Sequence, residues 1–448
     1  MEYSVTSLIT DIALASLLIF TGQILRAKIK IIQKLFLPAP LIAGFLGLLL
    51  GPEGLAVLPF SSALSSYPYT LIIVLFGSLF IGRQSNGGLK KMITSVEDTF
   101  LLNMAAETGQ FGFALVIGTS VFALLFPDLH SAFALMMPAG FAGGHGYAAS
   151  IGGTLQDIAG WEEAITIGQT FATIGLILGV LIGIAAINYA IKKGYTQYIT
   201  NMSGLPESMR TGFFNAAEQK TLGKETTCSI SMETLTWHLA LILMAAGGAY
   251  LIDYLYGLLN LNFSLPMVCL SMFCGVFINW FLKLLRLDKS IDRNTISRVG
   301  SSITDYLVFF GIASIRISVV SEYLLPIIIM SLLGVAYCFF YVFVICKKLY
   351  TDNWFERGIF IFGWNMGVVA IGIILLRIVD PDMKSGTLED YGFAYVLISI
   401  IELAMITFIP VFAAYHHGFL TGCVLLIFFA FLLISAQRIK KRNQRSLY

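Results

Sequence analysis

The sequence predicts an all-α polytopic membrane protein built as an inverted repeat. Each repeat has five transmembrane helices plus one re-entrant hairpin, and one additional C-terminal transmembrane helix follows. Three observations predict this fold class. Hydrophobic residues make up 57% of the 448 residues and charged residues only 12%, whereas soluble domains carry roughly 25% charged residues. Glycine-rich breaks interrupt two apolar stretches, and similar landmarks recur in the same order in both halves.

Eleven apolar segments are long enough to cross about 30 Å of hydrocarbon, which takes roughly 20 residues. They are 6–25, 39–58, 67–82, 99–126, 163–191, 234–259, 264–282, 302–320, 323–346, 391–414 and 418–436. Two more apolar stretches, 131–155 and 353–378, have glycine-rich middles. Irregular backbone at membrane depth persists only where protein or a solvated cavity surrounds it. We therefore expect these two stretches to be re-entrant hairpins.

The basic residues predict the orientation, with the N-terminus outside and the C-terminus cytoplasmic. The segments placed inside carry Arg26, Lys28, Lys30, Lys34, Arg83, Lys90, Lys91, Lys192, Lys193, Lys283, Arg286, Lys289, Arg293, Arg298, Lys347, Lys348 and the tail Arg438–Arg445. The outer segments 51–66, 127–130 and 260–263 contain no Lys or Arg, as the positive-inside rule requires. Because the basic residues follow the topology, the net charge of +2 indicates no nucleic-acid partner.

The repeat boundaries follow from the shared landmarks. Leu37-Pro38 corresponds to Leu265-Pro266, Phe76-Gly77-Ser78 to Phe310-Gly311-Ile312, and the break at 143–146 to the one at 363–367. Residues 1–193 form the first repeat, 194–233 a cytoplasmic linker, 234–415 the second repeat, and 416–448 the extra helix and basic tail. Five crossings per repeat is an odd number, so the second copy is inverted. Paired discontinuous elements in inverted repeats are the best sequence indication of a transporter's binding site.

The first break supplies the candidate substrate site Gly143, Gly144, His145, Gly146 and Tyr147. Half-helices of about 11 residues reach roughly 16 Å, so their turn falls near the membrane midplane. A half-helix that starts there offers free N–H groups and a positive dipole end to an anion. The alternative for the glycines is tight helix packing. His145 either contacts substrate, braces the turn or relays a proton, and without ligand partners it is a poor metal candidate.

The second break supplies Asn365 and Gly367, preceded by Gly363 and Trp364. Asn365 provides both a donor and an acceptor. We place these residues opposite the first break as the weaker half of the substrate site.

The span at 163–191 carries Gln169 and Thr173 ahead of Gly175, Gly179 and Gly183. The glycines recur every four residues on one face, so we expect them to pack against a hairpin. The amide and hydroxyl oxygens are candidate ligands for a hard cation such as Na⁺. A generic hydrogen bond between helices is the equal alternative.

Ionisable groups inside a membrane are functional candidates by default. Asn103, Glu107 and Gln110 share one helix face, and Glu402 lies deep in its span one turn after Ser399. We expect Ser399 and Glu402 to take part in ion coupling, with Glu402 as cation ligand or proton carrier. Arg316, the single basic residue near the outer surface, either binds an anion or extends to the membrane interface.

The chain resembles the bacterial sodium:glutamate symporters. The resemblance rests on Gly-Gly-His-Gly at 143–146, the glycine-rich run at 172–183, the Leu-Pro entry to the second span and the two equal halves. It implies a secondary active transporter in the bacterial inner membrane. Such a carrier is a homodimer that takes up L-glutamate with Na⁺ by alternating access, moving a transport domain against a scaffold. Departures from the family pattern are Tyr147 in place of Thr, bulky residues in the second break, and Ser399 and Glu402 in place of an Asp/Asn pair.

Two other functions remain open at this point. One is an H⁺- or Na⁺-coupled carrier of a different carboxylate, and the other is a channel or a polytopic membrane enzyme. We find no metalloprotease, paired-Asp or nucleophile-elbow motif that favours an enzyme. The six cysteines lack metal-site spacing, so we expect no cofactor and no ion other than the coupling Na⁺.

Overall fold

The computed structural model describes residues 5–34, 37–82, 97–198, 211–216, 219, 221–258, 267–350, 352–380 and 384–445. Every regular element within these ranges is a helix. In the same ranges, eight helices are long and apolar enough to cross a membrane. The prediction of an all-α polytopic membrane protein is therefore confirmed. The landmark Leu265-Pro266, the basic residues Arg83, Lys90 and Lys91, and the outer segment 260–263 lie outside the described residues.

The chain forms two compact units, and each contains segments from both predicted repeats. Unit 1 comprises Met1–Gly22, Ala39–Asn86 and Phe214–Ser314, and unit 2 comprises Gln23–Pro38, Gly87–Phe213 and Ile315–Tyr448. The helices of unit 1 are most of α1 (Val5–Lys28), α3 (Ala39–Leu50), α4 (Tyr67–Ser78), α11 (Thr234–Leu258), α12 (Met267–Leu284) and α13 (Arg293–Ala313). The longer helices of unit 2 are α6 (Glu97–Ile117), α8 (Met136–Ala159), α9 (Ala164–Lys193), α15 (Leu324–Phe340), α17 (Trp354–Val379), α18 (Thr387–Ala414) and α19 (Gly418–Arg445).

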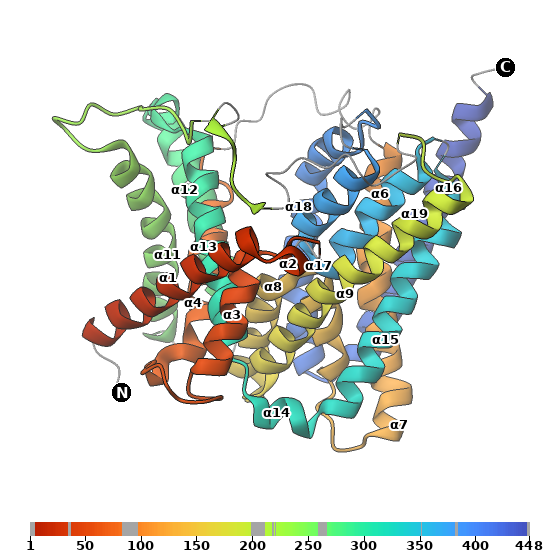
Figure 1. Cartoon of the computed structure of the whole chain (residues 1–448), viewed down its shortest axis with the longest axis horizontal. Coiled ribbons are helices and arrows are strands. Elements are labelled where there is room, and N and C mark those ends of the chain that lie inside the picture. Colours follow the sequence, from red (N-terminus) through yellow and green to blue (C-terminus); the bar gives the residue numbers. More distant parts are fainter. Residues whose placement is uncertain are drawn as a thin grey trace. The chain divides into compact units, whose positions relative to one another are not determined.

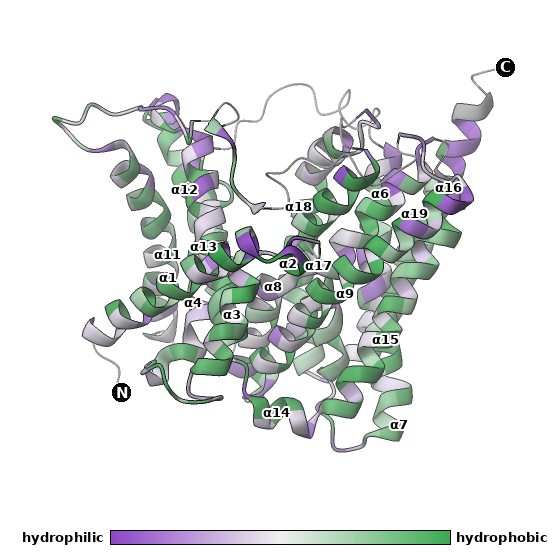
Figure 2. Ribbon diagram, in the orientation of Figure 1, coloured by the Kyte–Doolittle hydropathy of each residue, from purple (hydrophilic) through white to green (hydrophobic). Residues whose placement is uncertain are grey.

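Short elements complete the chain in Figure 1. They are α2 (Lys30–Lys34), η1 (Ser62–Ser66), η2 (Gly118–Phe122), α7 (Ala123–Leu125), η3 (Phe133–Leu135), η6 (Asp288–Ser290), α14 (Ile317–Glu322), η7 (Tyr341–Cys346) and α16 (Lys347–Leu349). Figure 2 shows hydrophobic residues along α9 and α15, and hydrophilic residues at α16 and the far end of α19. This pattern fits helices whose middles lie in a bilayer and whose ends lie in water.

Several predicted spans differ in length from their helices. The helix of the 39–58 span ends at Leu50 and that of the 67–82 span at Ser78. Both helices have 12 residues, a rise of about 18 Å, which is shorter than the hydrocarbon layer. α13 instead begins at Arg293 and ends at Ala313, whereas the apolar pattern predicted 302–320. Composition alone therefore does not fix where the helix of an apolar stretch begins and ends.

Small residues let the helices of unit 1 approach closely. A side chain on Gly44 would collide with Ile312 of α13, and one on Gly77 of α4 would meet Ser271 of α12 and Ala245 of α11. Three aromatic residues, Phe60, Phe309 and Phe310, pack in the core between α1, α3 and α13. Close contact of small residues is the usual way to pack helices in a membrane, where lipid removes the hydrophobic driving force between them.

A buried carboxylate fixes α1 to Ser61 and to the first residue of α4. Asp11 is fully buried. It accepts hydrogen bonds from the Ser61 N–H at 2.9 Å and the Tyr67 hydroxyl at 2.8 Å, and from the Ser61 hydroxyl. Three donors around one carboxylate compensate the loss of water that burial imposes.

In unit 2 the extra helix α19 packs along α6. A side chain on Gly109 would meet Phe429 of α19, and one on Gly112 would meet Leu426. Gly422 of α19 in turn lies against Leu115 and Val116 of α6. The helix that falls outside the predicted repeat is therefore an integral part of unit 2, which also contains both glycine-rich breaks.

Candidate functional site

α8 is broken at Gly144. This residue has φ +61° and ψ −157°, a backbone region that is essentially restricted to glycine. The helix bounds agree with the predicted 131–155 stretch to within a few residues. The break separates a first limb ending at Gly143 from a second limb that starts at His145 and ends at Ala159.

The two limbs of α8 run in opposite directions along α9. In the first limb, Met136 lies near Gly168, and Gly140 lies near Ala172, further along α9. In the second limb the order is reversed, because Gly152 lies near Ala164 while Ala148 lies near Gly168.

The segments that flank α8 also meet. His130 before the helix stacks on Trp161 after it, with ring centroids 4.4 Å apart. A continuous helix of 24 residues would hold its ends about 36 Å apart. The chain therefore returns to its starting side, and Gly144 forms the tip.

α17 is folded back in the same way. Its break lies at Gly367, with φ −165° and ψ 43°, and at Val368, with φ +65° and ψ 167°. A side chain on Gly363 would meet the backbone of Gly372 on the other limb, and Gly372 lies against the Phe360 carbonyl. A continuous helix would separate residues 360 and 372 by about 18 Å. A positive φ at a β-branched residue such as Val368 is a strained conformation.

The two tips meet beside α9. A side chain added to Gly144 would collide with Val368, so glycine is required there by contact as well as by conformation. On α9, Gly175 and Gly179 lie against Met366, and Gly183 lies against Leu375. The predicted packing of these glycines against a hairpin is confirmed. Gly367 is buried and contacts Leu176 of α9.

The buried imidazole of His145 is held at the start of the second limb. Its Nε2 lies 3.1 Å from the Thr173 hydroxyl, which itself donates to the Gln169 carbonyl at 2.9 Å. Because the hydroxyl hydrogen is engaged, Nε2 is the donor in this contact, which leaves Nδ1 as the acceptor of a neutral imidazole. Gln169 Nε2 donates to the His145 carbonyl at 3.1 Å. His145, Gln169 and Thr173 are thus brought together, a contact that the sequence did not predict.

Asn365 is buried next to the second tip. Its side-chain Nδ2 donates to the Ile361 carbonyl at 3.1 Å, while the backbone carbonyl of Asn365 accepts from Gln110 Nε2 of α6 at 3.2 Å. Gln110, which the sequence placed on the polar face of its span, therefore contacts the second break.

The side-chain atoms without partners around the tips are all acceptors. Within the described part of the chain, Gln169 Oε1, Asn365 Oδ1, Gln110 Oε1 and His145 Nδ1 are buried and make no hydrogen bond. Four buried lone-pair groups without donors are unfavourable unless a donor or a cation occupies the space. The arrangement favours a ligand that carries positive charge or N–H groups.

Tyr147 connects the first tip to α18. Its hydroxyl donates to Glu402 Oε2 at 2.8 Å. A side chain on Gly143 would overlap the Tyr147 ring, so this glycine gives the ring its space. Gly146 is partly buried on the second limb, and Ser399 is partly buried on α18 one turn before Glu402.

Arg316, which directly precedes α14, lies against the start of α9. Its Nη2 donates to the Glu162 carbonyl at 2.8 Å and its Nε to the Thr166 hydroxyl at 3.3 Å. These bonds hold the segment before α9. Neither alternative for Arg316, anion binding or extension to the membrane interface, is tested by these bonds, so both stay predictions.

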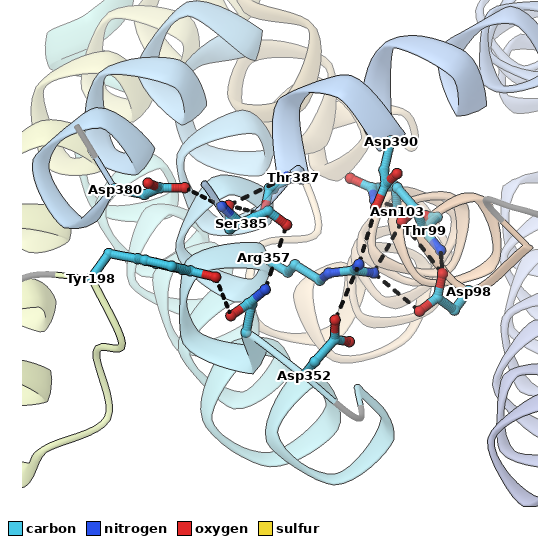
Figure 3. A network of polar contacts seen from close by, with 11 residues as sticks. Asp98, Thr99, Asn103, Tyr198, Asp352, Arg357, Asp380, Ser385, Thr387 and Asp390 are labelled. Atoms are coloured by element: carbon cyan, nitrogen blue, oxygen red, sulfur yellow. Dashed lines mark hydrogen bonds and ion pairs between the residues drawn. The ribbon is translucent and has the colours of Figure 1, made fainter. Parts of the chain in front are cut away.

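Sequence reasoning missed a polar network around Arg357, close to the start of α17 (Figure 3). The guanidinium is 3.0 Å from Asp98 of α6, 3.0 Å from Asp390 of α18 and 3.8 Å from Asp352. Nearby, the Tyr198 hydroxyl donates to the Asn353 side chain at 3.1 Å. The sequence did contain an indication of this network. Arg357 lies at the edge of an apolar stretch, and acidic residues lie at the ends of two other spans. The network fixes the start of α17 to α6 and α18.

The comparison with family models identifies the chain. Residues 5–375, most of its length, match the sodium/glutamate symporter model. The chain belongs to the sodium/glutamate symporter family. This is a family of transporters rather than enzymes, and Na⁺ is its coupling ion. A comparison with curated proteins finds no match. The matched region includes α8, α9 and the two tips, and it ends before α18, which carries Ser399 and Glu402.

Proposed function

We propose that this protein is a secondary active transporter that takes up L-glutamate with Na⁺ by alternating access. The family supports Na⁺-coupled transport. The observation that carries the proposal for this chain is the meeting of two broken helices at Gly144 and Val368, with buried acceptor atoms around them. Broken helices at membrane depth are how secondary transporters form sites for anions and cations.

The substrate carboxylate is proposed to bind at the first tip. The second limb of α8 begins after Gly144, and the start of a helix directs backbone N–H groups toward the space before it. These N–H groups and the helix dipole attract an anion. Gly143, Gly146 and Tyr147 border this position, and Asn365 and Gly367 border it from the second tip.

Na⁺ is proposed to bind to oxygens of α9. Gln169 Oε1 is a buried acceptor without a partner among the described residues, and Thr173 Oγ1 retains a lone pair next to it. Hard cations prefer such neutral or anionic oxygen ligands. Ser399 and Glu402 are the alternative ligands that the sequence indicated.

The membrane arrangement completes the proposal. The breaks in α8 and α17 are the tips of re-entrant hairpins from two inverted repeats, which explains why each compact unit combines segments of both repeats. Unit 2, which contains both tips, is proposed to be the moving transport domain, and unit 1 the scaffold. We propose that the protein lies in the bacterial inner membrane as a homodimer, with its N-terminus outside and its C-terminus in the cytoplasm.

A Na⁺ titration of L-glutamate uptake tests this proposal. Purified protein in liposomes at fixed pH is expected to show uptake that rises with Na⁺ and saturates. Gln169→Met keeps the side-chain length but removes the oxygen, and should raise the Na⁺ concentration for half-maximal uptake. Uptake that stays constant across the titration would exclude Na⁺ coupling.

A second candidate is H⁺-coupled transport of another carboxylate. It is favoured by the buried carboxyl of Glu402, which lies beyond the region that matches the family. In that case a pH gradient would drive uptake without Na⁺, and Glu402→Gln would abolish accumulation. Uptake that does not change with the pH gradient would exclude H⁺ coupling.

A further inference from the structure

A groove of about 520 Å³ lies between α18 and α19 in unit 2. Both helices pack on α6, and the apolar part of each is long enough to cross a membrane. Most of the residues that line the groove are apolar, among them Ile401, Met405 and Phe408 of α18 and Val424 and Leu425 of α19. An apolar groove between membrane-spanning helices is a place for hydrocarbon rather than for water.

The length of the groove matches one leaflet of a bilayer. Its lining extends from His417 to Phe428 along α19 and from Ile401 to Phe412 along α18. Each of these ranges rises about 16 Å, whereas half of the hydrocarbon layer is about 15 Å thick. The groove therefore has the length of an acyl chain within one leaflet. One end of it lies at the turn that joins the two helices, which the basic residues predict to be outside.

A polar pocket adjoins the groove at that end. It has a volume of about 380 Å³ and lies between the segment before α8 and the turn from α18 to α19. His416 and Phe419 line this pocket, whereas their chain neighbours His417 and Leu420 line the groove. A polar space at the membrane surface thus adjoins an apolar space of leaflet length, which is the arrangement of headgroup and tail in a lipid.

The polar pocket offers hydrogen-bond donors. Ser131 lines it, and within the described part of the chain its buried hydroxyl has no partner. His130 lines it as well, and its Nδ1 accepts from the Ala132 N–H at 3.2 Å. Nε2 therefore carries the hydrogen of a neutral imidazole. An unpartnered buried hydroxyl indicates a missing partner, and the acceptor oxygens of a phosphate group complement both donors.

We propose that unit 2 binds one phospholipid, with an acyl chain in the groove and the headgroup phosphate in the polar pocket. A plain lipid-facing surface needs neither a groove of leaflet length nor donors at its end. This site does not depend on the proposed transport function. α18 and α19 form most of the groove, and both follow residue 375, where the match to the family model ends.

The test measures lipid binding to the delipidated full-length protein in detergent by native mass spectrometry. Three probes separate the two parts of the ligand. They are dioleoyl phosphatidylglycerol, dioleoylglycerol, which lacks the phosphate, and glycerol 3-phosphate, which lacks the chains. The wild type should bind one phosphatidylglycerol. It should bind dioleoylglycerol roughly tenfold or more weakly, because hydrogen bonds to a charged group are lost, and glycerol 3-phosphate not measurably.

Two variants test the two parts of the site. Ala404→Trp fills the groove from an exposed position of α18 that lines it, and should abolish binding of both lipids. Ala430→Trp is the matched control, at an exposed position of α19 outside the lining of the groove, and should bind both lipids as the wild type does. Ser131→Ala removes the unpartnered hydroxyl. It should weaken phosphatidylglycerol roughly tenfold and leave dioleoylglycerol unchanged.

Several results would overturn the inference. Equal binding of the two lipids by the wild type, or equal weakening of both in Ser131→Ala, would exclude a phosphate in the polar pocket. Unchanged lipid binding in Ala404→Trp, or the same loss in Ala430→Trp, would exclude the groove as the place of the chain. Glycerol 3-phosphate that binds as tightly as phosphatidylglycerol would indicate a site for free phosphate compounds instead. If Ala404→Trp does not fold, Ser131→Ala decides, because its effect must differ between the two lipids.

Discussion

The tip of α8 gives the most quantitative prediction, through the substitution Gly144→Ala. Gly144 combines φ +61° with ψ −157°, a region in which a residue with a side chain costs about 1–3 kcal/mol. The added methyl would also overlap Val368 of the second tip. Since 1.4 kcal/mol corresponds to a factor of ten, the native tip should lose roughly 5- to 150-fold in population before the overlap is counted.

The control is Gly160→Ala, at the end of the same helix. Gly160 also has a positive φ, +66°, but a side chain there would meet nothing within 4 Å. Its φ/ψ values are those of a left-handed helix cap, which costs a residue with a side chain about 1–2 kcal/mol. This variant should lower the melting temperature while its affinity for substrate stays that of the wild type.

The assay is L-glutamate uptake at limiting concentration, with the folded fraction of each variant measured in detergent. Gly144→Ala should raise the KM for L-glutamate by roughly 5- to 150-fold, whereas Gly160→Ala should leave the KM unchanged. Wild-type KM in a folded Gly144→Ala protein would refute the assignment of this tip to the substrate site.

Three further predictions follow from other contacts. Thr173→Val removes the hydroxyl that holds His145, which is worth about 0.5–1.5 kcal/mol, and should raise the Na⁺ concentration for half-maximal uptake; an unchanged Na⁺ curve would contradict this role. Arg357→Ala removes the cation that three acidic residues share. Loss of one partner costs roughly 3–5 kcal/mol in a fully buried pair, and less here because these acids are partly exposed; Arg357→Lys should lose less, and equal melting temperatures would contradict the network. Burial alone would raise the pKa of Asp292, but hydrogen bonds, chiefly from Thr295, outweigh it and lower the pKa. The cap of α13 therefore stabilises the protein above the pKa of an unfolded aspartate, about 3.9, and this stabilisation is lost as the pH falls through the lowered pKa. Asp292→Ala should cost about 0.5–2 kcal/mol at neutral pH and little in acid. Thermal unfolding at both pH values measures the difference.

The sequence was sufficient to locate both breaks because a glycine inside an apolar stretch indicates an unusual backbone conformation or a close contact. Gly144 adopts a conformation that other residues avoid, and Gly175 and Gly179 leave space for the second tip. These requirements can be read from residue type and spacing alone. The second break was harder to locate, because Val368 accepts a positive φ that its side chain disfavours, and nothing in its identity indicates this.

The pairings between distant residues could not be predicted. Glu107 and Glu402 were each recognised as acids inside apolar spans, but the packing of α6 against α18, which carry them, could not be predicted. The same holds for Arg357 and its acidic partners, which come from three separate segments. One sequence contains the period of each helix but not the register between helices, so side-chain partners across helices require the structure.

The central claim is that this protein uses a Na⁺ gradient to concentrate L-glutamate. The most direct measurement is the accumulation of labelled L-glutamate in proteoliposomes with an inward Na⁺ gradient, compared with K⁺ or choline gradients of equal strength. We predict accumulation above the external concentration that requires Na⁺ and collapses when a sodium ionophore is added. Uptake that only equilibrates, or that proceeds equally in K⁺, would contradict the account.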